Sequence, residues 1–287
     1  MSDRAALPGE ALAMWKLLKF LPRNLISRWV GRLVHWKGPA FWNHVTIAVF
    51  AAIYRINLSE AEKSPWDYPS LGEFFVRRLK PGARPLAAVA AVHCADSEIL
   101  MSGRIENGTC LQAKGKKYQV RDLLVDAEWI GKFEDGFFVA YYLCPTDYHR
   151  VHSPVDGFIR KVTYVPGDLW PVHRDAVSEM EGLYLVNERV IVEIASDQGA
   201  VAVVFVGAMN VGSIELSFDS IVKGNDGQPF LEKVYEIPRE IKKGEELGMF
   251  RMGSTVVALF SPEFRRLHED GLNVSGHVKV NSALTRT

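Results

Sequence analysis

Short apolar runs separated by turn residues fill the chain from about Val92 onward, and they constrain its fold more than any other feature. Segments of this length that are rich in Val, Ile, Phe and Tyr are typical of β-strands. The clearest examples lie at 136–143, 189–194, 201–206 and 255–260. The sequence therefore predicts a β-rich core for this part of the chain.

The N-terminal part has a different pattern, with apolar residues at helical spacing. One apolar run covers 12–21, and a second predicted helix covers about 25–36, with Asn24 as its N-cap. A third run, 45–56, is shorter than the roughly 20 residues that span a bilayer. Helices followed by a strand-rich region predict the α+β class, with an amphipathic helical N-terminal region and a β-rich core.

Charge is distributed unevenly over these two parts. Residues 11–59 contain no Asp or Glu, although the whole chain has 34 acidic and 34 basic residues. The stretch holds seven basic residues and four of the seven tryptophans: Lys16, Lys19, Arg23, Arg28, Arg32, Lys37, Arg55, Trp15, Trp29, Trp36 and Trp42. Such helices are typical of a membrane interface, and the alternative is a helical subdomain packed on the core. We expect a membrane-associating helical region over 1–65 and a β-rich domain over 66–287.

Composition also argues against several other classes of protein. The net charge of zero argues against a general nucleic-acid binder, which needs a basic excess to neutralise phosphates. Cys94, Cys110 and Cys144 fit no zinc pattern and no redox pair, and so few cysteines indicate a reducing compartment. The first residues lack the basic-then-apolar order of a signal peptide, so none is expected.

Three short segments could carry chemistry. Gly253-Ser254-Thr255 lies between two apolar runs and would by itself be an ordinary turn. His149 and His152 lie three residues apart, and imidazoles at this spacing can share a face and transfer protons near neutral pH. No further ligands stand at workable spacing, so we expect no metal site. Asp96 would by itself be a turn aspartate.

In their order along 70–262, these segments resemble the bacterial phosphatidylserine decarboxylases. The matching segments are Phe74-Phe75-Val76-Arg77, Arg84-Pro85, Asp96, 112–118, 145–152, 164–169, 187–190, 206–208, 211–214 and Gly253-Ser254-Thr255. Two positions depart from the family pattern. Met252 replaces a leucine of similar volume, and Ser97 replaces a glycine. If that glycine has a positive φ, Ser97 would strain the turn that carries Asp96.

The resemblance implies that the precursor cleaves itself. The Ser254 hydroxyl would attack the carbonyl of Gly253, which divides the precursor into a β chain (1–253) and an α chain (254–287). Ser254 would become a pyruvoyl group, so that 66–287 is a catalytic domain. That group would form a Schiff base with the amine of phosphatidylserine and yield phosphatidylethanolamine and carbon dioxide. Neither pyridoxal phosphate nor a metal is then expected.

The resemblance also assigns roles to the polar residues. His152 would be the base for cleavage, oriented by Asp96, because a serine hydroxyl needs an oriented base to become nucleophilic. His149 would protonate the carbanion that remains after carbon dioxide leaves. Asp147 would support one of the histidines, and Arg150 would face the substrate phosphate.

The expected partners follow from the same resemblance. They are phosphatidylserine in the bilayer, an anionic membrane surface, and the other chain of an α/β heterodimer that could itself form a homodimer. The expected location is peripheral, on the cytoplasmic face of the bacterial inner membrane. A rival interpretation is a membrane-associated serine hydrolase using Ser254, His152 and Asp96, although the chain lacks a Gly-x-Ser-x-Gly elbow at this serine. A second rival is a lipid-binding β module in which Ser254 is dispensable.

Overall fold

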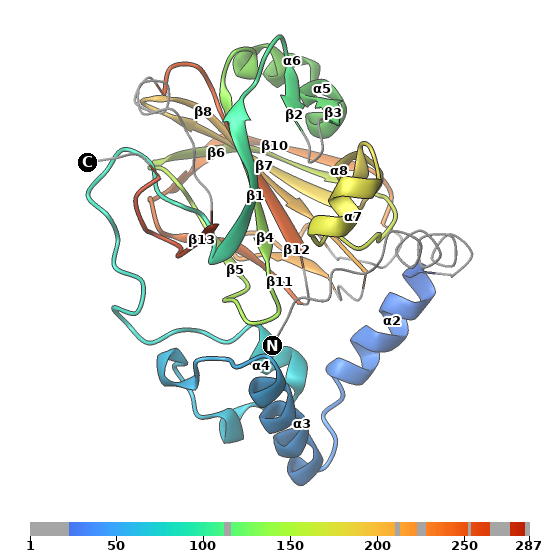
Figure 1. Ribbon diagram of the computed structural model, residues 1–287. Coiled ribbons are helices and arrows are strands. Elements are labelled where there is room, and N and C mark those ends of the chain that lie inside the picture. The colour runs from blue at the N-terminus through green and yellow to red at the C-terminus, as the bar shows by residue number, and fades with distance from the viewer. Residues whose placement is uncertain are drawn as a thin grey trace.

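An antiparallel eight-stranded sheet forms the centre of the molecule, in the order β10-β6-β7-β8-β12-β4-β1-β13 (Figure 1). The structure is a computed structural model, and it describes residues 23–111, 116–209, 213–222, 228–251, 254–264 and 276–284. The strands of this sheet are β1 (Ser97–Arg104), β4 (Phe137–Leu143), β6 (Gly157–Val165), β7 (Arg189–Ser196), β8 (Gly199–Val206), β10 (Leu231–Ile241), β12 (Ser254–Phe260) and β13 (Gly276–Val278).

Two smaller sheets accompany the central one. A three-stranded sheet has the order β5-β11-β9, and β2 pairs with β3 in a hairpin. Their strands are β5 (Arg150–His152), β9 (Ile214–Leu216), β11 (Glu246–Phe250), β2 (Thr109–Leu111) and β3 (Lys117–Gln119). The three-stranded sheet bears on two of the predicted site residues, because β5 carries His152 and β11 leads toward Ser254.

The central sheet has an apolar core on each of its faces. Successive side chains of a strand point to opposite faces. In β12, Val256 and Ala258 therefore belong to one core, whereas Val257 and Leu259 belong to the other. This double burial explains why the segment 255–260 is apolar throughout rather than alternating.

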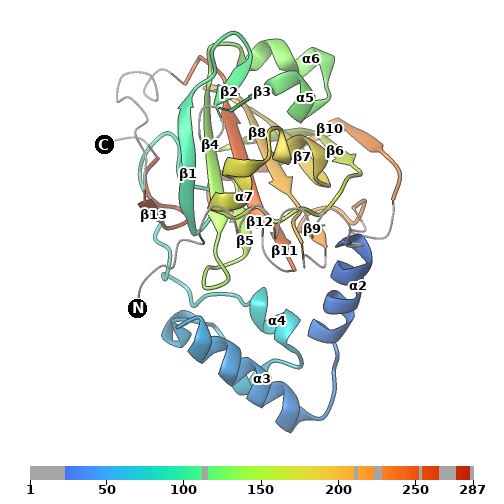
Figure 2. The same cartoon turned by 45° about the vertical axis from the view of Figure 1, so that its right-hand side comes forward.

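Different layers cover the two faces (Figure 2). One core includes Leu247 and Phe250 of β11, so the three-stranded sheet covers that face. The other core includes Leu123, Trp129 and Leu183, which come from the helical layer. That layer consists of α5 (Val120–Leu124), α6 (Ala127–Ile130), η4 (Gly131–Phe133), α7 (Arg174–Glu179) and α8 (Leu183–Val186).

The N-terminal helices form a group at one end of the sheet (Figures 1 and 2). They are α2 (Arg23–Val34), α3 (Ala40–Ile53), the 3-10 helices η1 (Leu58–Glu60) and η2 (Pro65–Asp67), and α4 (Leu71–Phe75). On α3, Asn43, Ile47 and Ala51 recur every fourth residue and are buried. Ile47 and Ala51 pack with Tyr68 and Phe74 in a third small core. That core joins α3 to α4.

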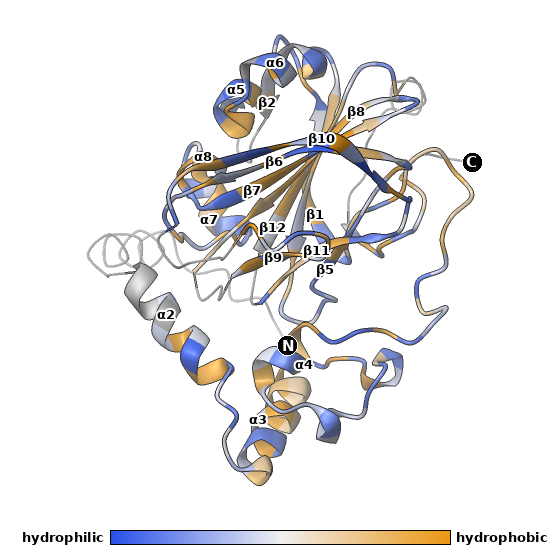
Figure 3. Cartoon of the chain, turned by 180° about the vertical axis from the view of Figure 1, so that it is seen from behind, coloured by the Kyte–Doolittle hydropathy of each residue, from blue (hydrophilic) through white to orange (hydrophobic). Residues whose placement is uncertain are grey.

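The outer side of α3 is also apolar, but it is exposed (Figure 3). Phe41, Val45, Val49 and Ile53 are between 38% and 69% exposed. Trp29, Leu33 and Trp36 are likewise exposed on and just after α2. Among the described residues, no helix combines the length and the hydropathy needed to cross a bilayer.

The predicted class and the predicted strands are confirmed. The structure is α+β, and the four apolar runs correspond to β4, β7, β8 and β12. The helix expected over 25–36 corresponds to α2, but Asn24 lies inside that helix, so the predicted cap is wrong. The third apolar run corresponds to α3, which begins earlier, directly after Pro39.

Two further predictions about the N-terminal part stay open. The apolar run 12–21 lies outside the described residues. The boundary between 1–65 and 66–287 stays a prediction. Phe74 of α4 lies beyond that boundary and packs in the same core as α3.

Candidate active site

Two segments that connect the central sheet with the three-stranded sheet lie beside each other. The loop that carries His149 leads from β4 into β5, and the segment with Gly253 leads from β11 into β12. Ser254 pairs with Leu143 in the central sheet, and the Phe250 amide donates to the His149 carbonyl at 3.1 Å. The chain on either side of Gly253 is therefore held beside the histidine loop. Gly253 itself and the Ser254 side chain lie outside the described part of the structure.

His149 is fully buried and neutral. Its Nδ1–H donates to the carbonyl oxygen of Asp147 at 3.0 Å, which leaves a lone pair on Nε2. Nε2 is buried and has no hydrogen-bond partner among the described residues. The ring packs against Phe75, with 3.9 Å between centroids, and burial lowers the pKa of His149 to about 3. The arrangement presents an unoccupied proton acceptor.

The end of α4 and the residues after it hold this loop in place. Arg77 Nη2 donates to the Thr146 carbonyl at 3.0 Å, and its guanidinium lies 5.3 Å from the ring centroid of Phe74. The Val76 carbonyl accepts a hydrogen bond from Arg150 Nε at 2.9 Å. The Phe-Phe-Val-Arg segment therefore supports the histidine loop by direct contact.

Arg150 forms an ion pair with Glu246, and the expectation that it faces the substrate phosphate stays a prediction. Its Nη1 donates to both carboxylate oxygens of Glu246, at 2.8 and 2.9 Å. The side chain is buried, and Nε is bound by the Val76 carbonyl. Paired in this way, the guanidinium has little capacity left for a phosphate.

His152 is also held as a neutral imidazole. Its Nδ1–H donates to the Gly244 carbonyl at 2.8 Å, so Nε2 accepts from the Tyr148 hydroxyl at 3.2 Å. Burial lowers the pKa of His152. Two backbone-anchored histidines on one loop and strand thus present acceptor Nε2 atoms.

Asp96 is bound by an arginine rather than by His152, which corrects the predicted Asp96–His152 pair. Arg84 Nε donates to the two carboxylate oxygens at 2.9 and 3.0 Å, and Nη2 donates to Oδ2 at 2.5 Å. The Val280 amide donates to Oδ1 at 2.8 Å. The physical reason is that a guanidinium matches a carboxylate with several charge-assisted hydrogen bonds, whereas His152 finds a backbone carbonyl.

The backbone at Ser97 carries no strain of the kind expected. Ser97 is absent from the described non-glycine residues with a positive φ, and it begins β1 in extended conformation. The glycine of the family pattern is therefore not required here for a left-handed turn. Ser97 leaves Asp96 free to adopt its observed position.

Comparison with known proteins decides the family. The sequence pattern described as "Phosphatidylserine decarboxylase" matches residues 71–286. The chain belongs to the phosphatidylserine decarboxylase family. Several similar relatives are named phosphatidylserine decarboxylase proenzyme. One from Myxococcus xanthus is 37% identical over 94% of this chain and 96% of its own length, and one from Anaeromyxobacter is 40% identical over 87% and 90%.

A third relative supports the same family assignment. The protein of that name from Actinobacillus pleuropneumoniae is 41% identical over 80% of this chain and 82% of its own length. Family membership confirms the resemblance that the ordered segments indicated. The match begins at Leu71, the first residue of α4, so this short helix belongs to the part that the family shares.

A histidine near the C-terminus joins the site of this decarboxylase-family chain, and no sequence motif marks it. His277 of β13 lies with Nε2 2.9 Å from Asp147 Oδ1, and the Cys144 amide donates to Oδ2 at 2.8 Å. Burial raises the pKa of Asp147. The contact spans 130 residues, so spacing along the chain could not reveal it. Asp147 supports the histidine loop, but through His277 and through its own carbonyl to His149.

The described residues show no cluster of His, Cys, Asp and Glu suited to a metal ion. The family segment at 112–115 lies outside the described residues. The site therefore consists, as far as it is described, of backbone-oriented histidines, buried carboxylates and the strand that begins at Ser254.

Proposed function

We propose that this chain is a self-cleaving decarboxylase that converts phosphatidylserine to phosphatidylethanolamine and carbon dioxide. The observation that carries the proposal is the unpartnered, buried Nε2 of His149 beside the chain crossing that contains Gly253 and Ser254. The names of the relatives support it, because "proenzyme" denotes a precursor. The hydrolase rival is weaker, since the family model and the relatives that match this chain are named for phosphatidylserine decarboxylation.

Cleavage would proceed by an N-to-O shift. The Ser254 hydroxyl attacks the Gly253 carbonyl carbon, the new ester C–O bond forms, the C–N bond breaks, and the amine nitrogen gains a proton. Loss of the α-proton then expels the Gly253 carboxylate from the serine side chain. The dehydroalanine left at 254 reacts with water and releases ammonia, which gives the pyruvoyl group. His152 is our assigned base: its neutral Nε2 would accept the hydroxyl proton after release of the Tyr148 hydroxyl that it now binds.

The residues present suit such a group at position 254. A pyruvoyl group supplies a carbonyl that condenses with the substrate amine and takes up the electrons of the broken carbon–carbon bond. The orphaned Nε2 of His149 accepts a proton and returns it to the α-carbon of the product. Burial lowers the pKa of His149, so its protonated form gives up a proton to a carbanion more readily than a free imidazolium does.

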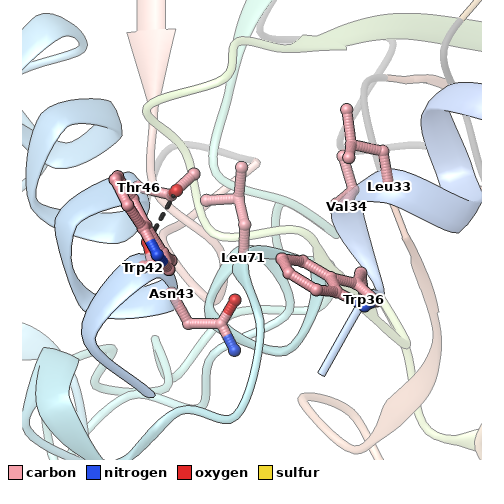
Figure 4. Close-up of a pocket in the computed structure, with 7 residues that line it drawn as sticks. All are labelled: Leu33, Val34, Trp36, Trp42, Asn43, Thr46 and Leu71. Carbon is pink, nitrogen blue, oxygen red and sulfur yellow. Dashed lines mark hydrogen bonds between the residues drawn. The ribbon is translucent and has the colours of Figure 1, made fainter. Parts of the chain in front are cut away.

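The lipid substrate would approach from the exposed apolar side of α2 and α3. A hollow of about 420 Å³ lies between these helices (Figure 4), and it is lined by Leu33, Val34, Trp36, Trp42, Asn43, Thr46 and Leu71. Leu71 begins α4, and Phe75 stacks on His149 four residues later, about one helical turn away. We propose that an acyl chain occupies the hollow while the headgroup lies toward His149. Peripheral binding at the cytoplasmic face of the inner membrane is part of the same proposal.

The intact mass of the purified protein tests the cleavage. Wild type should give two chains, with the smaller one beginning at position 254 as a pyruvoyl group that resists Edman sequencing. Ser254→Ala should remain one chain of 32.2 kDa without activity. A wild-type protein that stays intact and fully active would refute the proposal, and labelling of Ser254 by a fluorophosphonate would favour the hydrolase.

His149→Ala separates the two stages. We expect this variant to cleave but to lose decarboxylation by at least about a hundredfold, because general acid catalysis typically contributes 10²–10⁴-fold. The measurement is carbon dioxide release per pyruvoyl group. An uncleaved His149→Ala protein would instead assign this histidine to processing.

A further inference from the structure

Arg251 lies directly after β11, two residues before Gly253 of the proposed cleavage site. Its Nε donates to Glu215 Oε1 at 2.5 Å, and its Nη2 donates to Glu215 Oε2 at 2.9 Å. Its Nη1 donates to Glu73 Oε1 at 2.9 Å. The Arg251 amide also donates to the Ser213 carbonyl at 3.0 Å. Both the backbone and the side chain of Arg251 are therefore fixed.

The two glutamates come from two different elements, β9 and α4. Glu215 lies in β9, where it is paired with Met249 of β11. Glu73 lies in α4, two residues before Phe75, which stacks on the His149 ring. The same short helix therefore contacts both the histidine loop and the residue that precedes the cleavage segment.

The charges around Arg251 argue against a role in binding the substrate phosphate. Its guanidinium is only 22% exposed and faces two carboxylates. A bidentate arginine–carboxylate pair fixes both position and orientation. With all three guanidinium nitrogens already bonded to carboxylates, the group is suited to holding the backbone rather than to binding an anion.

We propose that Arg251 is a positioning residue for self-cleavage. This inference rests on the proposed function and adds to it the ion pairs that fix Arg251, two residues before Gly253. Intramolecular attack depends on a carbonyl and a hydroxyl that are held in near-attack geometry, and a misplacement of about 1 Å can cost about 10²-fold. Release of Arg251 from Glu215 and Glu73 frees the segment that carries the Gly253 carbonyl.

A pulse-chase of the full-length chain in cell-free translation tests this role. Arg251→Met should slow conversion of precursor to two chains by about 10–100-fold. Arg251→Lys keeps the positive charge but cannot form the bidentate pair with a carboxylate, so it should retain part of the rate. Glu215→Gln and Glu73→Gln should each slow conversion less than Arg251→Met. Arg174→Met is the matched control, because Arg174 forms an exposed ion pair with Glu98 and should convert at the wild-type rate.

A second measurement separates positioning from general stability. Once cleaved, Arg251→Met should decarboxylate at the wild-type rate per pyruvoyl group, because the segment has completed its reaction. A wild-type rate of conversion in Arg251→Met would overturn the inference alone. Equal losses of conversion, of activity per pyruvoyl group and of melting temperature would also overturn it, in favour of a structural role. A wild-type chain that never converts would overturn the proposed function together with the inference.

Discussion

Single residues in this molecule are oriented mainly by backbone groups and arginines. The Asp147 carbonyl fixes the tautomer of His149, and the Gly244 carbonyl fixes that of His152. Carboxylates that could have done this are already bound, since Asp96 is held by Arg84 and Asp147 by His277. The histidines are therefore kept neutral and directed without a charged partner.

Arg84 offers a test of what Asp96 does. Arg84 also binds Glu60 Oε2 at 2.8 Å, so it links η1 to a carboxylate that is 1% exposed. We predict that Arg84→Met lowers the free energy of unfolding by about 3 kcal/mol, because removal of one partner leaves a buried charge. The measurement is urea unfolding in the uncut Ser254→Ala background.

A double variant provides the control for this prediction. Arg84→Met with Asp96→Asn should be more stable than Arg84→Met alone, since the unpaired charge is then gone. A loss below about 1 kcal/mol in the single variant would show that Lys279 and the Val280 amide suffice for Asp96.

The residue scale also shows where sequence reasoning stops. His149, His152 and Ser254 were selected from their order along the chain, and the structure brings the backbone of Ser254 beside the loop of His149. The partners of the carboxylates could not be selected in this way. The resemblance pairs Asp96 with His152, and only the fold shows that Arg84 reaches the carboxylate.

At the scale of elements, the helical layer is tied to the sheet by a buried cluster of charges. Asp126 caps α6 by accepting from the amides of Glu128 and Trp129, and it forms an ion pair with Lys161 of β6. Lys161 also lies 4.0 Å from Glu193 of β7, which is fully buried. Burial raises the pKa of Glu193 to about 8. Lys161 thus pairs with the N-cap of α6 and lies close to a buried carboxyl group of the neighbouring strand β7.

This cluster predicts a pH dependence of stability. The folded-state pKa of Glu193 lies above the ordinary value of 4.5, so its contribution is fully present below pH 4.5 and is lost as pH rises through about 8. We predict that the melting temperature of Ser254→Ala falls as pH rises from 4.5 to about 8, and that adding Glu193→Gln flattens this slope. The difference should reach a few degrees, since each kcal/mol corresponds to about 2–4 °C.

The control uses the exposed partner of the same lysine. Glu232→Gln removes a carboxylate 3.0 Å from Lys161 that is 40% exposed, and it should leave the slope nearly unchanged. Equal slopes in wild type and Glu193→Gln would contradict the assignment of this pH dependence to Glu193.

Elements were more predictable than their arrangement. The run 255–260 is predicted as a strand, because short apolar runs of β-forming residues bounded by turn residues are typical of strands. Its place between β8 and β4 could not be derived, because Val257 pairs with Val204 and Ala140, far away in the chain. The helices were harder to delimit, since α3 is apolar on both its buried and its exposed sides and gives no clear helical stripe.

For the molecule as a whole, the exposed apolar row on α3 predicts binding to anionic vesicles. We expect the Ser254→Ala protein to sediment with phosphatidylglycerol vesicles and to bind less at high salt, because basic residues contribute. Val49→Glu with Ile53→Glu should weaken binding at least about tenfold, since burial of each such side chain is worth about 1.5–3 kcal/mol.

Val234→Glu is the matched control for the vesicle experiment. Val234 is 65% exposed on β10, at the opposite end of the molecule from α3 (Figure 1). This variant should bind vesicles as the Ser254→Ala protein does. If all these proteins bind alike, the apolar row does not form the membrane-binding surface.

The interior position of β12 has a consequence for how the protein is made. This strand is hydrogen-bonded on one side to β8 and on the other to β4, so a cut at its first residue leaves the short chain locked within the sheet. Before the cut, folding is a search within one molecule. Afterwards, a denatured pair must find each other in solution, and recovery then depends on protein concentration. If the proposed cleavage occurs, the uncut precursor would therefore fold efficiently, whereas the cleaved enzyme would refold poorly after denaturation.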